Sequence, residues 1–103
     1  MMVAILGSDE LEINENDMYR YIKNVIYPHS LTEVVVTGSD GIAECAADMA
    51  SRYGLALHHV PSRREAVEMA PSVVIFRYSD ESHYDSDYCA RKGRPFKEYV
   101  VAS

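Results

Sequence analysis

The segments VAILGSD at residues 3–9 and VVVTGSDG at residues 34–41 share one pattern, an apolar run that ends in Gly-Ser-Asp. Four consecutive apolar or β-branched residues between turn residues are typical of a strand buried on both faces, as in parallel sheets. Parallel strands end at the same edge of their sheet, where ligands of α/β folds bind. The repeat therefore predicts two neighbouring strands whose glycine turns meet at that edge.

Helical periodicity follows each of these segments. Apolar residues at spacings of three and four predict one helix over residues 18–26 and another over residues 42–53. The expected boundary residues are Asn16 or Asp17 as N-cap and Pro28 as the stop for the first helix, and Gly54 after the second.

The remainder of the chain continues the alternation of strands and helices. Further strands are predicted at residues 55–60, 72–76 and 96–101. Ser62 and Glu65 form a capping box for a short helix, and a polar loop over residues 77–87 is expected before a last helix that stops at Gly93. We therefore predict a single α/β domain over residues 1–103, a three-layer Rossmann-like sandwich with a five-stranded, mostly parallel sheet.

Composition and charge narrow the classes of partner. A chain of 103 residues that is 48% hydrophobic is long enough for one packed core. Its net charge of −6 argues against binding to nucleic acid, which needs a basic face. No apolar run reaches the roughly 18 residues of a membrane helix, and the start lacks the basic region of a signal peptide, so we expect a cytoplasmic protein. Cys45 and Cys89 are far apart, and neither a metal site nor a cofactor is predicted.

The two glycine turns supply the main candidates for ligand binding. Glycine lets the backbone approach a ligand, and the N–H groups that open a helix attract anions, so the first hypothesis is a nucleotide or another phosphate-bearing small molecule. The alternative is that the glycines only form tight turns. Carboxylates repel phosphate, so Asp9 and Asp40 are candidates for contacts with ribose hydroxyls. For Asp40 the alternative is a role as the N-cap of the following helix. The candidates are Gly7, Ser8, Asp9, Gly38, Ser39, Asp40 and Gly41.

Later segments add further candidates at the same edge of the sheet. Arg63 and Arg64 open the short helix, where they either pair with phosphate or stay on the surface. Tyrosines 78, 84 and 88 either stack on a nucleobase or cover a subunit interface. The ligand-binding candidates of this region are Arg64, Tyr78, Ser79, Ser82 and His83. Glu44, with His83 as its possible partner, is the candidate for general acid or base chemistry, against the alternative of a solvated helix residue.

The order of these motifs resembles the SLOG superfamily of Rossmann-like nucleotide-binding domains, and most of all its small YspA/YpsA-like branch. Residues 7–9 are similar to the family's Gly-Ser-Arg turn, residues 19–22 to its Tyr-x-x-Ile helix, and residues 38–46 to its glycine-rich second turn. Residues 69–76 and 93–101 resemble its later strands. The chain departs from the family at Ala43, where an aspartate is usual, and at residues 82–86, where a phosphate-binding Gly-Thr is usual.

The resemblance implies a small domain that binds or senses a nucleotide or nucleotide-derived molecule at the carboxyl edge of its sheet. Two alternatives remain at this point. One is an enzyme that hydrolyses or transfers an N-glycosidic bond of a nucleotide through Glu44. The other is a non-catalytic, oligomeric interaction protein with a degenerate site. A homo-oligomer is expected in each case, because a short sheet leaves exposed faces.

Overall fold

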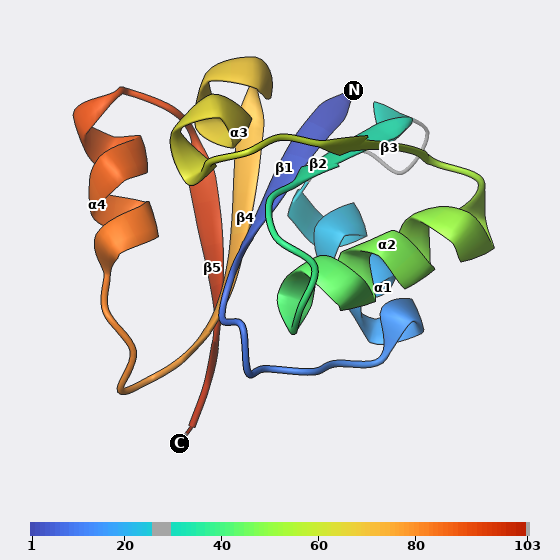
Figure 1. Ribbon diagram of the computed structural model, residues 1–103, viewed down its shortest axis with the longest axis horizontal. Helices are drawn as coiled ribbons and strands as arrows, with labels where there is room; N and C mark the ends of the chain where they lie inside the picture. Colours follow the sequence, from blue (N-terminus) through green and yellow to red (C-terminus); the bar gives the residue numbers. More distant parts are fainter. Residues whose placement is uncertain (26–29, 103) are drawn as a thin grey trace.

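A computed structural model describes residues 1–25 and 30–102 as a sheet of five parallel strands between two layers of helices (Figure 1). The elements in chain order are β1 (Met2–Gly7), α1 (Glu15–Val25), β2 (Glu33–Val36), α2 (Ile42–Tyr53), β3 (Ala56–His59), α3 (Arg63–Met69), β4 (Ser72–Tyr78), α4 (Tyr84–Arg91) and β5 (Phe96–Val101). This confirms the predicted α/β sandwich, with a sheet that is entirely parallel. Among the described residues, no helix has the length and apolar character needed to cross a bilayer.

Two apolar layers hold the sandwich together. On one face of the sheet, α1 and α2 pack their buried side chains, such as Met18 and Met49, against Ile5 and Phe76. On the other face, α3 and α4 pack Val67 and Cys89 against alternate residues of the same strands. The three central strands β1, β2 and β4 therefore bury both faces, because successive side chains of a strand point to opposite sides, whereas the edge strands β3 and β5 stay largely exposed.

The strand order β3-β2-β1-β4-β5 decides where a ligand site can form. The chain runs outward from β1 to β3, and α3 then carries it back across the sheet to β4, beside β1. The connection from β1 leads to α1 on one face, whereas the connection from β4 leads to α4 on the other (Figure 1). The carboxyl ends of β1 and β4 thus form the topological switch point, at which a crevice opens in such sheets.

Several predicted boundaries are confirmed. Gly54 has the left-handed φ of 67° that ends α2, and the Glu65 N–H donates to Ser62 Oγ at 3.2 Å, as expected of a cap. The expected stop at Pro28 lies outside the described residues.

Other boundaries were predicted wrongly. The helix α1 begins at Glu15, and Asn14 Oδ1 accepts the Asn16 N–H at 2.8 Å, so neither Asn16 nor Asp17 is its cap. The N-cap of α2 is Gly41 without a side-chain cap, so Asp40 does not serve in that role. The predicted loop over residues 77–87 shrinks to residues 79–83, because β4 continues to Tyr78 and α4 already begins at Tyr84.

Candidate functional site

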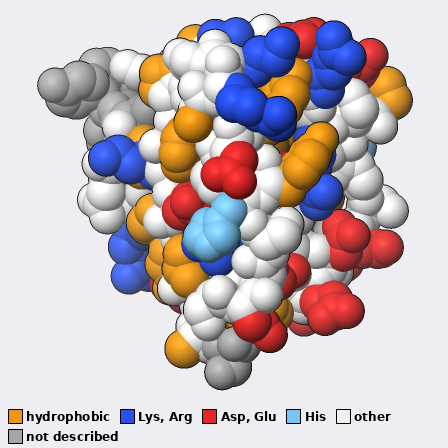
Figure 2. Space-filling view, turned by 90° about the vertical axis from the view of Figure 1, so that its left-hand side faces the viewer, with side chains coloured by type: hydrophobic (Ala, Val, Ile, Leu, Met, Phe, Trp, Pro, Cys, Tyr) orange, Lys and Arg blue, Asp and Glu red, His pale blue; other side chains and the backbone are white. Residues whose placement is uncertain are grey.

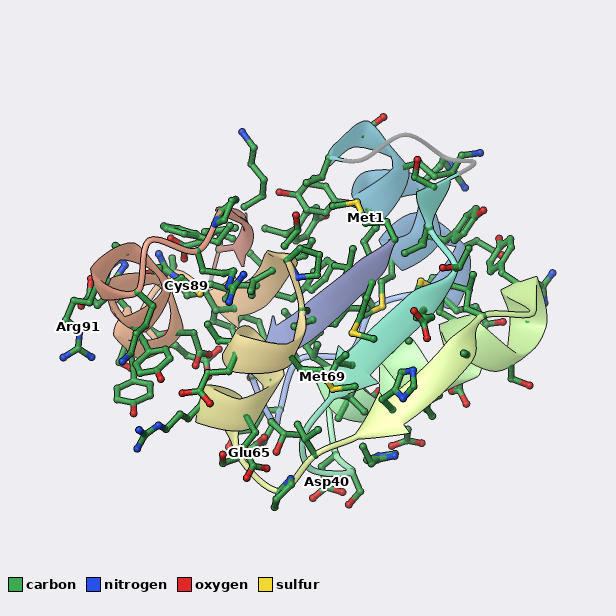
Figure 3. The ribbon with its side chains drawn as sticks, turned by 90° about the horizontal axis from the view of Figure 1, so that it is seen from above. Met1, Asp40, Glu65, Met69, Cys89 and Arg91 are labelled. Atoms are coloured by element: carbon green, nitrogen blue, oxygen red, sulfur yellow. The ribbon has the colours of Figure 1, made fainter. Side chains whose placement is uncertain are left out.

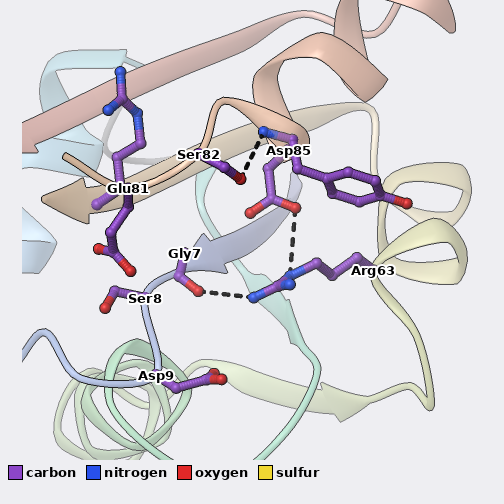
Figure 4. A pocket seen from close by; sticks show the side chains of 9 residues that line it. Gly7, Ser8, Asp9, Arg63, Glu81, Ser82 and Asp85 are labelled. Atoms are coloured by element: carbon purple, nitrogen blue, oxygen red, sulfur yellow. Dashed lines mark hydrogen bonds and ion pairs between the residues drawn. The ribbon is translucent and has the colours of Figure 1, made fainter. Parts of the chain in front are cut away.

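A polar pocket of about 240 Å³ opens at the switch point, between the carboxyl ends of β1 and β4 (Figure 4). Residues from four segments, far apart in the sequence, meet around it. Its lining consists of Gly7, Ser8 and Asp9 from the end of β1 and its following turn, Arg63 of α3, Arg77, Glu81 and Ser82 from β4 and its following turn, and Tyr84 and Asp85 of α4. We call this the switch-point pocket.

The turn after β1 forms the floor of the pocket and is held by backbone contacts. The Ser8 N–H donates to the Phe76 carbonyl at 3.0 Å, which ties the turn to β4. Ser8 Oγ accepts the N–H groups of Glu10 and Leu11 at 3.0 and 3.1 Å, so this buried hydroxyl caps its own loop. Its hydroxyl hydrogen is the part that can still donate to a ligand.

The second glycine turn packs directly on the first. The Ile42 N–H at the start of α2 donates to the Ser8 carbonyl at 3.1 Å. A Cβ at Gly41 would lie 2.4 Å from the Asp9 carbonyl carbon, so only glycine fits here. The turns meet as the repeat predicted, but they meet backbone against backbone. The first N–H group of α2 is therefore bonded within the protein and is not directed at a ligand.

Two arginines enter the pocket, and both are already paired. Arg63 donates from Nη2 to the Gly7 carbonyl at 3.0 Å and holds its Nε 3.3 Å from Asp85 Oδ1. Arg77, a buried residue, donates from Nε to Glu98 Oε2 at 2.5 Å and places Nη2 3.1 Å from His83 Nδ1. Because the cations are occupied, the pocket suits hydroxyl and amino groups better than a bare phosphate.

The outer wall is a tight turn closed by Glu81. Its Oε1 accepts the Tyr78 N–H at 2.8 Å, and its own N–H donates to the Tyr78 carbonyl at 3.1 Å. Ser82 Oγ accepts the Tyr84 N–H at 3.3 Å, which joins this wall to the start of α4 (Figure 4). The Glu81 and Ser82 side chains are thus held in place before any ligand binds.

Asp85 gives the pocket a measurable pH dependence. Burial raises the pKa of its carboxyl above the ordinary 3.8; the Arg63 guanidinium opposes this, and the charge of Asp9 adds to it. The folded state therefore holds a proton on Asp85 at pH values where the unfolded state has lost it. We expect the contribution of Asp85 to the free energy of unfolding to fall as pH rises from about 3.8 through the raised pKa.

Denaturant unfolding of the wild type and of Asp85→Asn between pH 3 and pH 7 checks this expectation. The difference in unfolding free energy, wild type minus variant, should decrease with rising pH across that window and then level off. Arg63→Met should extend the fall to higher pH, because the opposing cation is gone. A difference that rises with pH would contradict the assignment.

The structure gathers four of the predicted ligand-binding residues around the pocket, namely Gly7, Ser8, Asp9 and Ser82. Gly38, Ser39 and Asp40 are exposed beyond the pocket, and Glu44 is exposed on α2 away from it. His83 stands behind the lining against Arg77, and the Ser79 N–H donates to the Val101 carbonyl at 2.8 Å. Tyr78 packs toward the α1 and α2 layer, and Arg64 lines a different groove.

For Arg63, which was expected either to pair with phosphate or to stay on the surface, the sequence carried a signal that it faces the pocket. It lies three and four positions before the buried Ala66 and Val67, so it shares their face of α3, whereas Arg64 shares the exposed face of Glu68. Arg77 follows Val73 and Ile75 in the period of a strand, which points its side chain toward α4. The helical period of α3 and the two-residue period of β4 would together have predicted that Arg63 and Arg77 face the pocket.

Other reactive groups in the described part of the chain do not form a site. No three His, Cys, Asp or Glu side chains there gather closely enough to hold a metal ion. Burial, reinforced by the nearby Asp85 charge, raises the pKa of the Cys89 thiol to about 11, so it stays protonated at neutral pH. Cys45 accepts the Ile13 N–H at 3.4 Å and packs beside the core of α2.

Comparison of the chain with protein-family models, with curated proteins and with solved structures finds no match. The SLOG resemblance carried by the sequence motifs therefore stays a prediction.

Proposed function

We propose that this domain binds a nucleotide or a nucleotide-derived small molecule in the switch-point pocket. The observation that carries the proposal is the position of the pocket, between the carboxyl ends of β1 and β4, from which the chain leaves toward opposite faces of the sheet. Open parallel sheets bind ligands at this point, because the diverging connections leave a crevice there. The position of the pocket supports a ligand site, and the residues that line it determine which ligand groups can bind there.

The lining favours the sugar end of such a ligand. Asp9, Glu81 and Asp85 provide carboxylate acceptors, and Arg63 and Ser82 provide donors beside them. The two neighbouring hydroxyl groups of a ribose can each donate and accept a hydrogen bond. A ribose therefore matches a lining that offers both acceptors and donors. A volume of about 240 Å³ is below the range of about 300–1,000 Å³ that encloses a drug-sized ligand, so only part of the molecule enters.

Binding is proposed here without turnover. The N-glycosidic reaction considered above needs Glu44 in the pocket, and Glu44 is exposed on α2 and outside the lining. The alternative of a degenerate interaction protein expects a filled cleft, whereas the switch-point pocket is open in the single chain. Its second expectation, that Tyr84 and Tyr88 are buried against another subunit, stays a prediction. The homo-oligomer expected from the sequence stays a prediction.

The proposal predicts that nucleotides stabilise the folded protein. A ligand at about 100 times its Kd adds about 2.7 kcal/mol to the free energy of unfolding. For a domain of this size, that is on the order of 10 °C in Tm. Thermal unfolding with adenosine, AMP, ADP, ATP, NAD and ADP-ribose measures the shift.

A matched pair of variants ties the shift to the pocket. Asp9→Ala removes an exposed carboxylate that faces the pocket, and we expect ligand affinity to fall about tenfold or more. Asp48→Ala removes an exposed carboxylate of α2 outside the lining and should leave affinity unchanged. If no nucleotide shifts the Tm, or if both variants weaken binding equally, the proposed function is wrong.

A further inference from the structure

A second, wider depression of about 440 Å³ runs along the outer side of α4. Three cations and two tyrosines line it: Arg64, Tyr84, Tyr88, Arg91 and Lys92. We call it the cationic groove. Tyr84 lines both this groove and the switch-point pocket, so the two depressions share one wall. A ligand that leaves the pocket past Tyr84 enters the groove.

The charge of the groove is opposite to that of the whole chain. The protein carries a net charge of −6, yet none of the described residues that line the groove is a carboxylate. Lysine and arginine side chains gather over the upper part of one face of the molecule, with hydrophobic and a few acidic side chains between them (Figure 2). A lining with three cations on an acidic protein attracts anions.

Two of the cations are available to an incoming anion. Arg91 and Lys92 make no ion pair within the described residues. They lie 5.7 and 5.8 Å from the ring centre of Tyr88, whose face holds them along the groove. Figure 3 shows Arg91 pointing away from the sheet. Arg64 completes the groove from α3, with its Nε 3.3 Å from Glu68 in a pair that is exposed on both sides and therefore weak.

We infer that the cationic groove holds the phosphate chain of the nucleotide whose sugar lies in the switch-point pocket. This inference rests on the proposed function and names the substrate class as a nucleotide with two or more linked phosphates. Tyr84 and Arg91 lie seven residues apart on α4, about 10 Å along its axis. The cations gather around Tyr88 rather than at Tyr84, so a chain of phosphates that extends from Tyr84 along the groove reaches more of them than a single phosphate does.

The arrangement also explains why the glycine turns do not serve as the phosphate cradle. The first N–H of α2 is bonded to the Ser8 carbonyl, and the pocket contains three carboxylates. A phosphate is repelled by such a lining and attracted by the groove next to it. The dipole of α4 favours cations at its last turn, which accounts for Arg91 and Lys92 but not for Arg64, which belongs to another helix.

Calorimetric titration with adenosine, AMP, ADP and ATP tests the inference. We expect affinity to rise about tenfold or more from AMP to ATP, because each added charge-assisted contact is that strong. The double variant Arg91→Gln/Lys92→Gln should abolish the rise and leave adenosine binding unchanged. Added salt should weaken ATP binding more than adenosine binding.

The control variant is Arg20→Gln/Lys23→Gln on the opposite layer. It removes the same charge, and Lys23 also lies over a tyrosine ring, 5.3 Å from the centre of Tyr19. We expect it to keep the full rise from AMP to ATP. A loss of the rise in this control as well would trace the effect to net charge and overturn the assignment to the groove.

The outcomes separate this inference from the proposed function. If adenosine, AMP, ADP and ATP bind with equal affinity, the groove does not bind phosphate. The inference is then overturned, while the proposed function stands. If none of them binds, both are wrong. If inorganic tripolyphosphate binds the wild type and not Arg91→Gln/Lys92→Gln, while adenosine binds neither, the groove is an anion site independent of nucleotides, and both are again overturned.

Discussion

Replacing Gly7 with alanine is expected to lower the free energy of unfolding by about 4 kcal/mol, a large part of the stability of a domain this size. A Cβ at Gly7 would lie 1.8 Å from the Phe76 carbonyl oxygen, and the φ of +145° adds strain of its own. The neighbouring atom belongs to the backbone of β4 and cannot rotate away. The substitution therefore has to separate β1 from β4 at the end of their ladder, where the pocket begins.

Gly38→Ala is the matched control, because it imposes positive φ without a clash. Gly38 has φ of +80°, and nothing lies within 4 Å of its added Cβ, so we expect a loss of about 1 kcal/mol. Denaturant unfolding of the two variants measures both losses, and their difference isolates the contact with β4. Losses of equal size would show that β1 and β4 yield to the added methyl group, against the expectation.

The two Gly-Ser-Asp segments were enough to predict the centre of the sheet. An apolar run before each turn forces a strand that is buried on both faces, and burial of both faces requires helices above and below. That logic depends only on the pattern along the chain. It holds for β1 and β2 because all their central residues enter one core layer or the other.

The chemistry of the turns could not be predicted in the same way. From its own sequence, each turn has the composition of an anion cradle, with a glycine and small polar residues. The fold brings the turns so close that Gly41 makes room for the Ser8–Asp9 backbone, and the Ile42 N–H bonds to the Ser8 carbonyl. This contact joins residues more than thirty positions apart, and no local pattern encodes it.

Asp85, the carboxylate that α4 contributes to the pocket, was missed for a different reason. The sequence of α4, YDSDYCAR, is polar, and only Ser86 and Cys89 are buried, so the apolar period that reveals a helix is nearly absent. The helix also begins at Tyr84 without a side-chain cap from His83. With the start placed too late, Asp85 appeared as a loop residue. In the helix it lies four positions before Cys89 and faces inward, toward Arg63.

Arg77→Met is expected to cost about 3 kcal/mol of unfolding free energy, because it leaves a partly buried charge without its partner. The Arg77 and Glu98 side chains are 10% and 20% exposed and meet at 2.5 Å between Nε and Oε2. Methionine fills much of the same volume and brings no donor. The partly buried Glu98 carboxylate then loses its cation, and His83 Nδ1 loses the Nη2 group 3.1 Å away.

The double variant Arg77→Met/Glu98→Met separates the pair from the penalty of breaking it. With both charges gone, no buried ion lacks a partner, and we expect the loss to shrink to about 1 kcal/mol or less. Denaturant unfolding of the two single variants and the double variant completes the cycle. A double variant as unstable as Arg77→Met would mean that the arginine acts through its hydrogen bond to the Tyr78 carbonyl, 3.2 Å from Nη1, and through packing.

If the double variant is stable, it also provides a folded protein whose pocket lacks one arginine. Its nucleotide affinity then reports what Arg77 contributes at the pocket without the confounding loss of stability.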